Sequence, residues 1–251
     1  GGSVSQAVHA LRAGADAVYC GAPRFSARSH ARNLDFADLR ALAGEADQRG
    51  AAVYLALNTL LTDDELGPAL ETAWLAWEAG AKALIVQDIG LLRPRVRHGP
   101  PLPLHASTQM ANHSASGARQ VQDWGITRVV LARELTLAEI ETICRTVGEL
   151  EYEVFIHGAL CYGVSGQCLA SGMLLGRSGN RGDCGQICRT WSTLATPERE
   201  NAGFWFSMND LEHSFAVQEG PSPFEIVDDA VADFFLFVGN DEKGLVISEP
   251  V

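Results

Sequence analysis

The chain has 251 residues, of which 47% are hydrophobic, and it carries a formal net charge of −12 at pH 7. This length and apolar content are typical of a soluble globular protein with one substantial core, and no apolar run is long enough to predict a membrane-spanning helix. The acidity is uneven, because residues 198–251 hold twelve acidic and two basic residues, a net of −10, and the remainder carries only −2. The acidic excess argues against broad nonspecific binding of nucleic acid, which needs positive charge against the phosphates.

Short apolar segments alternate with amphipathic segments along residues 1–157. The apolar segments predict buried strands and the amphipathic ones predict helices that pack on them. Thr136, followed three residues later by Glu139, has the spacing of a capping box at a helix start. Strands that alternate with helices at this spacing predict parallel βα units. The expected strands are 16–20, 51–57, 83–86, 102–105, 128–132 and 152–156, and the expected helices are 5–13, 35–48, 62–79, 113–124 and one from residue 136.

Polar residues follow nearly every expected strand. In a parallel barrel, the carboxyl ends of the strands surround one mouth, which is where active sites lie. Strand ends also meet solvent, so a single polar residue there carries little weight. An adjacent Arg133 and Glu134, with His105 near one strand end and His157 after another, are together a stronger signal. The residues at these ends are Asn58, Asp88, Ser107, Arg133, Glu134 and His157.

The glycine-rich stretch 158–189 contains Cys161, Cys168, Cys184 and Cys188, four of the six cysteines in the chain. Glycine allows the tight turns that bring distant sulfurs to one point, and thiolates are the ligands that iron–sulfur clusters and zinc select. This stretch therefore predicts a metal centre. An iron–sulfur cluster is favoured over zinc, because the first two cysteines lack the CxxC spacing of a zinc hook. Two disulfides, which need an oxidising compartment, and four core cysteines remain as alternatives.

The other two cysteines lie outside this stretch. Cys144 shares a helix face with apolar residues and is expected in the core. Cys20 ends a strand near the predicted mouth, so it is left open as a substitute ligand.

Arginines accompany the four cysteines. Arg177, Arg181 and Arg189 lie in the same stretch, and Arg133 lies at the predicted mouth. Their forked donors suit a dicarboxylate or an RNA phosphate, although isolated arginines are more often solvated loop charges.

Motifs for proteolysis are absent from the sequence. It has no HExxH zinc motif and no GxSxG nucleophile elbow. A Cys161–His157 pair is conceivable, but a thiolate that ligates a metal cannot also act as the nucleophile.

Four stretches resemble the collagenase-like peptidases, peptidase family U32. They are GADAVYCGAPRFSAR (14–28), LHASTQM (104–110), RVVLAREL (128–135) and the cysteine block EVFIHGALC…SGQC…SGNRGDCGQICR from residue 153. The resemblance covers residues 1 to about 211, and the cysteine block is long and specific. Members of this family once described as proteases resemble iron–sulfur hydroxylation factors that act without oxygen on tRNA, ribosomal RNA or ubiquinone precursors. The resemblance ties the RNA-modifying members to prephenate.

Compared with the family pattern, the chain departs at both ends. It begins just after the expected first strand, and the Lys-Ile-Glu-Gly-Arg-like block near the end is not found. Two apolar pieces, 234–238 and 245–247, predict a hairpin or edge strand that turns around Gly239 and Asn240. The predicted fold is therefore an α/β, TIM-barrel-like parallel sheet, incomplete at both ends. Its domain would span residues 1–211 with a Cys-rich loop insertion at 158–189, and 212–251 would be a divergent acidic tail.

Together, the residues and the resemblance predict an oxygen-independent hydroxylation enzyme that acts on RNA or on a small anionic substrate, with prephenate as a candidate co-substrate. A peptidase and a zinc-stabilised binding module are the alternatives. The enzyme is expected in the cytoplasm without a membrane, and a protein partner is left open. The expected cofactor is a 4Fe-4S cluster, or alternatively zinc, on Cys161, Cys168, Cys184 and Cys188. The proton-transfer candidates are His105, Glu134 and His157, and the substrate-binding candidates are Asn58, Asp88, Gln109, Arg133, Arg177, Arg181 and Arg189.

Overall fold

A computed structural model describes residues 3–31, 33–157, 161 and 163–189, and four short strands beyond them. Side chains are described within the first ranges, except at 94–97, 157 and 189. None of the helices in this described part is long and apolar enough to cross a bilayer. The predicted cytoplasmic location and the predicted boundary at residue 211 stay predictions.

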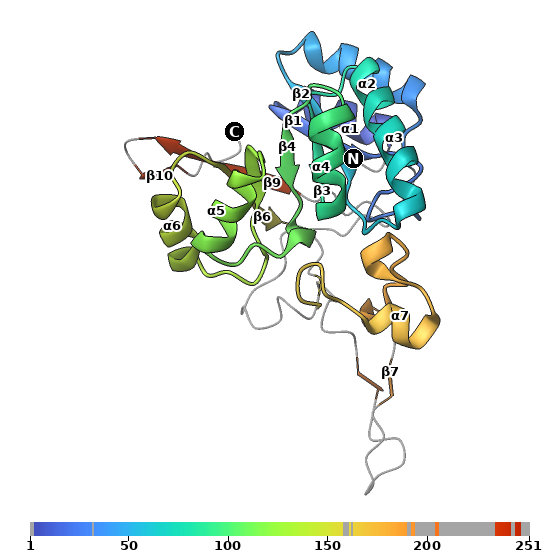
Figure 1. Cartoon of the computed structure of the whole chain (residues 1–251), viewed down its shortest axis with the longest axis vertical. Coiled ribbons are helices and arrows are strands. Elements are labelled where there is room, and N and C mark those ends of the chain that lie inside the picture. Colours follow the sequence, from blue (N-terminus) through green and yellow to red (C-terminus); the bar gives the residue numbers. More distant parts are fainter. Residues whose placement is uncertain are drawn as a thin grey trace, which may run out of the picture.

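One curled sheet organises the molecule (Figure 1). Its first six strands are parallel and lie side by side in chain order, which confirms the predicted βα architecture and gives a half-barrel. The strands are β1 (Ala17–Gly21), β2 (Ala52–Leu57), β3 (Ala83–Val86), β4 (Leu104–Ala106), β5 (Arg128–Val130) and β6 (Glu151–His157). Each overlaps the strand expected from the sequence.

A hairpin continues the sheet beyond β6. β9 (Phe234–Asp241) pairs antiparallel with β6, and β10 (Gly244–Val246) pairs antiparallel with β9. The two apolar pieces therefore extend the sheet, as predicted, but the predicted turn is wrong. Gly239 pairs with Val246 and Asn240 with Leu245, so both lie inside β9. There, ladder hydrogen bonds override the turn preference of a Gly-Asn pair.

Helices cover the convex face of the sheet (Figure 1). They bury Leu39, Leu42 and Leu91 against strand residues such as Leu55 and Leu84. The helices are α1 (Val4–Arg12), α2 (Phe36–Asp47), α3 (Leu66–Glu78), α4 (Ile89–His98), α5 (Ala115–Asp123) and α6 (Leu137–Thr146), with the short α7 (Ala170–Leu175) beyond the sheet. Four 3₁₀ turns, Asp63–Glu65, Thr108–Met110, Gly179–Arg181 and Ile187–Arg189, and a small ladder of β7 (Ser192–Thr193) with β8 (Phe204–Trp205) complete the elements.

Caps fix several helix starts where the sequence predicts them. The Thr136–Glu139 capping box is formed, and Asp35 caps α2 by accepting a hydrogen bond from the amide of Asp38. α5 begins at Ala115 after the cap Ser114, two residues later than predicted, because the serine hydroxyl accepts a hydrogen bond from the free amide of Gly117. α4 was not predicted, since Pro94 and three arginines obscure its short apolar face.

The concave face is so strongly curled that side chains from non-adjacent strands meet. Tyr54 on β2 and His105 on β4 contact edge to face across β3, with ring centroids 4.8 Å apart. The register places Ala83 of β3 beside Tyr54, and its small side chain leaves room for this contact. The guanidinium of Arg128 on β5 lies 5.2 Å from the centre of the Tyr54 ring. A barrel interior is usually apolar, but here it has a polar layer.

Candidate active site at the mouth of the half-barrel

Asn58 and Asp88, at the carboxyl ends of β2 and β3, hold the loops of the mouth in place. The Asn58 side chain accepts a hydrogen bond from the amide of Ala27 (2.9 Å) and donates one to the hydroxyl of Ser107 (3.2 Å). Asp88 accepts a hydrogen bond from the amide of Leu61 at 2.9 Å. The structure therefore brings the predicted strand-end residues to one mouth, while their predicted contact with substrate stays a prediction.

Arg133 and Glu134, which follow β5, bind the first half of the cysteine-rich segment, defined here as residues 161–189. Arg133 donates to the hydroxyl of Ser165 (3.1 Å) and to the carbonyl of Gly163 (3.3 Å). Glu134 accepts a hydrogen bond from the Ser165 amide at 2.7 Å and contacts His113 at 3.2 Å. Burial alone would raise the pKa of Glu134, but the hydrogen bonds from Ser165 and the charge of Arg133 hold it below its usual range. Glu134 is therefore a carboxylate at neutral pH and a better acceptor than acid.

Gln109 meets the same half of the segment through its backbone. Its carbonyl oxygen accepts a hydrogen bond from the side-chain amide of Gln87 at 3.4 Å. It also lies so close to Gly166 that a Cβ atom at that position would come within 1.9 Å of it. The role predicted for the Gln109 side chain stays a prediction.

Gly166→Ala should therefore displace the cysteine-rich segment. Gly166 has a φ of 69°, and an added methyl group would clash with the Gln109 carbonyl. We expect the free energy of unfolding to fall by more than the roughly 1 kcal/mol typical of a positive φ alone, and Cys168 to react faster with a thiol reagent. Gly176→Ala is the matched control, because Gly176 has a φ of 68° and open space around it. Equal effects of the two changes would contradict the close packing at Gly166.

Arg181 ties the second half of the segment to the loop after β2. Its guanidinium forms a forked pair with both carboxylate oxygens of Glu65, each at 2.9 Å, and donates to the carbonyl of Leu60 at 3.0 Å. The hydrogen bond from Arg181 lowers the pKa of Glu65 to about 2. This fork is already filled by a protein carboxylate, so the predicted substrate contact of Arg181 stays a prediction.

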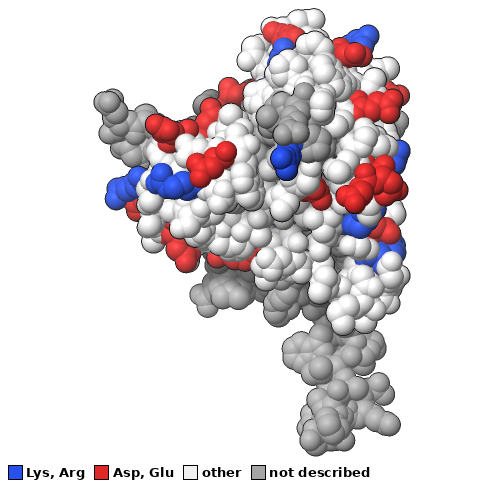
Figure 2. Space-filling view, in the orientation of Figure 1, with Lys and Arg blue, Asp and Glu red and all other residues white. Residues whose placement is uncertain are grey.

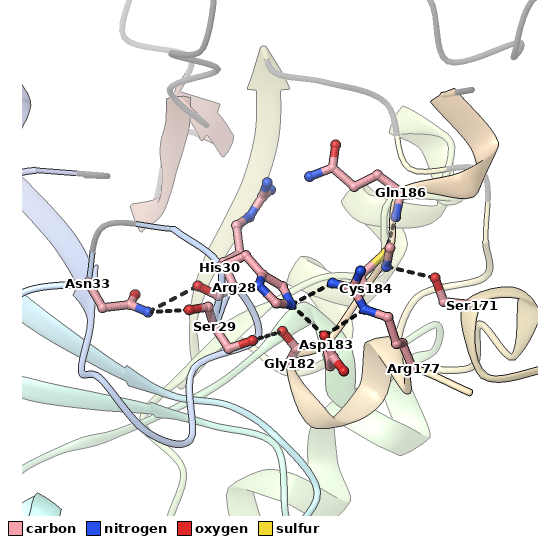
Figure 3. Close-up of polar contacts among 11 residues, drawn as sticks. Arg28, Ser29, His30, Asn33, Ser171, Arg177, Gly182, Asp183, Cys184 and Gln186 are labelled. Atoms are coloured by element: carbon pink, nitrogen blue, oxygen red, sulfur yellow. Dashed lines mark hydrogen bonds and ion pairs between the residues drawn. The ribbon is translucent and has the colours of Figure 1, made fainter. Parts of the chain in front are cut away.

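Arg177 takes part in a second tie, to the loop after β1 (Figure 3). It donates to Asp183 at 2.9 Å and contacts the ring nitrogen of His30 at 2.6 Å, and that nitrogen also contacts Asp183. The Ser29 hydroxyl donates to the carbonyl of Gly182 at 2.6 Å. Hydrogen bonds from His30 and Arg177 lower the pKa of Asp183. Arg177 thus positions the residue next to Cys184, and its predicted binding of substrate stays a prediction.

The cysteines of the segment form no disulfide bond. None of the six cysteines does so, which contradicts the disulfide alternative, and Cys161 and Cys184 are exposed. The amide of Gln186 donates to the Cys184 sulfur at 3.4 Å, and a Cβ on Gly163 would lie 2.9 Å from the Cys168 sulfur. An amide donor to sulfur and a glycine beside sulfur are compatible with an iron–sulfur cluster. Within the described residues, however, no three Cys, His, Asp or Glu side chains are gathered for a metal ion. The cluster and zinc therefore stay predictions.

The remaining cysteines lie away from the mouth. Cys144 is buried in the core, as predicted. Cys20 is only 1% exposed and packs into the core on the convex side of the sheet, where burial raises the pKa of its thiol to about 11. The suggestion that Cys20 replaces a ligand is therefore wrong, because its alternation along β1 turns it toward the helices.

His105 lies deep in the concave face and is 4% exposed. Burial, reinforced by the charge of Arg128, lowers its pKa to about 3. His105 is therefore a neutral imidazole near pH 7, so it is not a ready acid, and its proton-transfer role stays a prediction. The side chains of His157 and Arg189 lie outside the described residues, and their roles also stay predictions.

Glu153 on β6 is a buried acid that the sequence interpretation missed. It is 4% exposed, and burial raises its pKa to about 7 although Arg128 lies 3.8 Å away. Arg128 also binds Glu151 through two donors, at 2.8 and 2.6 Å. The available signal was the alternation of Glu151 and Glu153 with apolar residues, which places both carboxylates on one face of the strand.

The profile of peptidase family U32 matches residues 2–219. The chain is 46% identical over 185 residues to the 23S rRNA 5-hydroxycytidine C2501 synthase of Escherichia coli, covering 74% of this chain and 28% of that protein. It is 37% identical over 202 residues to the tRNA hydroxylation protein P of E. coli, covering 80% of this chain and 45% of that protein. It is 32% identical over 204 residues to a collagenase of Porphyromonas gingivalis, covering 77% of this chain and 49% of that protein.

The chain thus spans less than half the length of each of these three relatives. Among solved structures, the U32 peptidase Mk0906 superposes with a TM-score of 0.51 at 16% identity, covering 62% of this chain and 66% of that one. At this identity the match supports the barrel-like fold alone.

Proposed function

The chain belongs to peptidase family U32, and on that premise we propose that it hydroxylates a base of tRNA or ribosomal RNA without using oxygen. The observation that carries the proposal is the 46% identity over 185 residues to an rRNA hydroxycytidine synthase. The similarity to a tRNA hydroxylation protein supports the same class of reaction on a second kind of RNA.

The finer parts of the proposal concern the cofactor and the co-substrate. Cys161, Cys168, Cys184 and Cys188 would hold a 4Fe-4S cluster, which supplies electron transfer when bound. The exposure of Cys161 and Cys184 and the amide donor to the Cys184 sulfur support this assignment. Prephenate, expected from the family resemblance, would be the small anionic co-substrate.

Contacts from three strand-end loops support a role for the cysteine-rich segment in the active site. Arg133 and Glu134 bind it from β5, Arg181 binds Glu65 after β2, and Ser29 after β1 binds Gly182. Because these loops all follow the carboxyl ends of strands, the segment covers the mouth of the half-barrel, where (βα) enzymes carry their active sites.

The charge distribution favours a local grip on RNA over a broad one. On the face in Figure 2, basic side chains are scattered among acidic ones and form no continuous patch, and the whole chain carries −12. Binding dominated by phosphate contacts needs many exposed positive charges. We therefore favour recognition of a single nucleotide in an RNA loop over recognition of a duplex.

The proposal is tested by complementation. Wild-type chain, Cys184→Ala and Cys144→Ala are expressed in a host that lacks its own homologue, and the RNA is analysed by mass spectrometry. Wild type and Cys144→Ala, whose cysteine is in the core, should restore a missing hydroxyl, while Cys184→Ala should lose iron and restore less than about a tenth, because ligand loss and metal loss are coupled.

The contrary result is equally clear. Equal protein cleavage by wild type and Cys184→Ala, with no change in the RNA, would refute hydroxylation. It would make the collagenase relative the better guide to function.

A further inference from the structure

The side-chain oxygen of Gln87 and the Nδ1 atom of His105 are buried on the concave face without a hydrogen-bond partner among the described residues. The two residues are 5% and 4% exposed. A buried polar atom without a partner is costly to a folded protein. Such atoms are retained where a bound ligand or an ordered water supplies the missing hydrogen bond.

The two side chains lie on the same side of the sheet. The register pairs Ile85 with His105, and Gln87, which directly follows β3, continues the alternation of that strand, so it lies on the same face as His105 and one step nearer the mouth. Diagonal neighbours of this kind have Cα atoms roughly 7–8 Å apart, and long side chains can bridge that distance.

Each side chain is fixed at its other end. The Gln87 amide nitrogen donates to the carbonyl of Gln109, which lies against Gly166 of the cysteine-rich segment. The His105 ring packs edge to face against Tyr54. The free oxygen of Gln87 and the free nitrogen of His105 therefore have set positions just beneath the segment.

The chemistry of the two atoms selects the ligand. The Gln87 oxygen only accepts, so the ligand must bring an N–H or O–H group to it. The His105 ring is neutral and offers one donor or one acceptor. A phosphate or carboxylate would set negative charge against the Gln87 oxygen, so an anionic oxygen cannot be the group that meets Gln87. Arg128, the cation near His105, already binds Glu151 through two donors. The edge of a nucleobase is neutral and flat, and it carries donors beside acceptors.

We propose that Gln87 and His105 bind the hydrogen-bonding edge of a single nucleobase that has left its stack and entered the half-barrel beneath the cysteine-rich segment. Enzymes that modify a base commonly take it out of the stack in this way and read its edge in a closed site. The inference rests on the proposed function, because it takes the substrate to be RNA. It adds the two residues that recognise the base.

The inference is tested with free nucleosides on the full chain by saturation-transfer NMR. Uridine and cytidine should bind, and 3-methyluridine, whose blocked edge cannot donate, should bind at least about tenfold more weakly than uridine. His105→Phe keeps a ring against Tyr54 but removes Nδ1, and Gln87→Leu removes the oxygen. Both variants should lose at least about tenfold in uridine binding. The melting temperature of His105→Phe should stay unchanged or rise, because an unpaired polar atom has been removed, whereas that of Gln87→Leu should fall slightly, because this change also removes the hydrogen bond to the Gln109 carbonyl. His9→Phe, on the outer helix α1, is the matched control and should bind as wild type does.

Several results would overturn the inference. These are equal binding of uridine and 3-methyluridine, wild-type binding by both variants, or no nucleoside binding up to about 10 mM, below which even a weak site of this kind shows occupancy. If the variants do not fold, the comparison of uridine with 3-methyluridine on wild type still decides. If the chain restores RNA hydroxylation but binds uridine and 3-methyluridine equally well, this inference is rejected and the proposed function is kept. If the chain binds uridine more tightly than 3-methyluridine but hydroxylates no RNA, the inference is kept and the proposed function is rejected.

Discussion

Glu153→Gln and His105→Phe should change the pH dependence of the free energy of unfolding in opposite directions. The pKa of Glu153 is raised to about 7 in the folded chain. Between its unfolded value of about 4.5 and 7, the folded state keeps a proton that the unfolded state has lost. The free energy of unfolding therefore falls as pH rises through this window, by up to about 3 kcal/mol.

His105 has the opposite effect. Its pKa is lowered to about 3, so between pH 3 and 6.5 the unfolded state binds a proton that the folded state does not. The free energy of unfolding therefore rises with pH in that window, by up to about 5 kcal/mol. From pH 4.5 to 6.5 the two slopes cancel in the wild type.

Each substitution removes one of the two slopes. Glu153→Gln should leave a stability that rises from pH 4.5 to 6.5, and His105→Phe one that falls over the same range. Urea unfolding at half-unit pH intervals measures both, with His9→Phe as the control. If the free energy of unfolding changes with pH in the same way in the wild type and in both variants, neither Glu153 nor His105 has the shifted pKa given above. The charged and titratable groups that face the pair, Arg128, Glu151 and Tyr54, are unchanged in every variant.

Arg128→Met should cause the largest loss of stability of any single change in the half-barrel. The Arg128 side chain is 8% exposed and lies between Glu151, Glu153 and the ring of Tyr54. Above pH 7, where Glu153 is ionised, the removal of Arg128 leaves this buried carboxylate without a counter-charge, and breaking a buried pair in this way costs about 3–5 kcal/mol. The loss is measured as the free energy of unfolding in urea at a pH about two units above 7.

A control variant and a double variant test the reason for this loss of stability. Arg145→Met removes the exposed pair with Glu141 on α6 and should cost less than about 0.5 kcal/mol. The double change Arg128→Met with Glu153→Leu should recover much of the loss, because apolar groups can replace a buried ion pair at little cost. If the Arg128→Met variant is as stable as the Arg145→Met variant, Arg128 does not stabilise the buried Glu153 as its counter-charge.

Local patterns were sufficient for most of the fold. The period of the apolar residues predicted six strands and five helices, and the capping box predicted for Thr136 and Glu139 is present in the structure. These features depend on neighbours a few residues apart. α4 was missed because Pro94 interrupts its pattern, and the turn at Gly239 was misplaced because sheet pairing decided it.

The site was predictable only in part, because its contacts join residues far apart in the chain. The strand-end residues could be placed at one mouth from topology alone. The pairing of Arg181 with Glu65 could not, and neither could that of Arg128 with Glu153, since nothing in either local sequence identifies the partner. Burial of His105 and Glu153, which reverses their ordinary protonation, likewise follows from the curl of the sheet rather than from the residues themselves.

The ties of the cysteine-rich segment also set an order of events during folding. Adjacent parallel strands pair between residues 20 to 35 positions apart, as in Leu84 with Leu104 and Val18 with Val53. Ser29 and Gly182 are 153 positions apart, and Glu65 and Arg181 are 116 apart. Contacts across longer chain separations close larger loops and form later. On a ribosome, the parallel strands can therefore assemble while the cysteines are still being synthesised, so the segment meets a mouth that is already built when its thiols emerge.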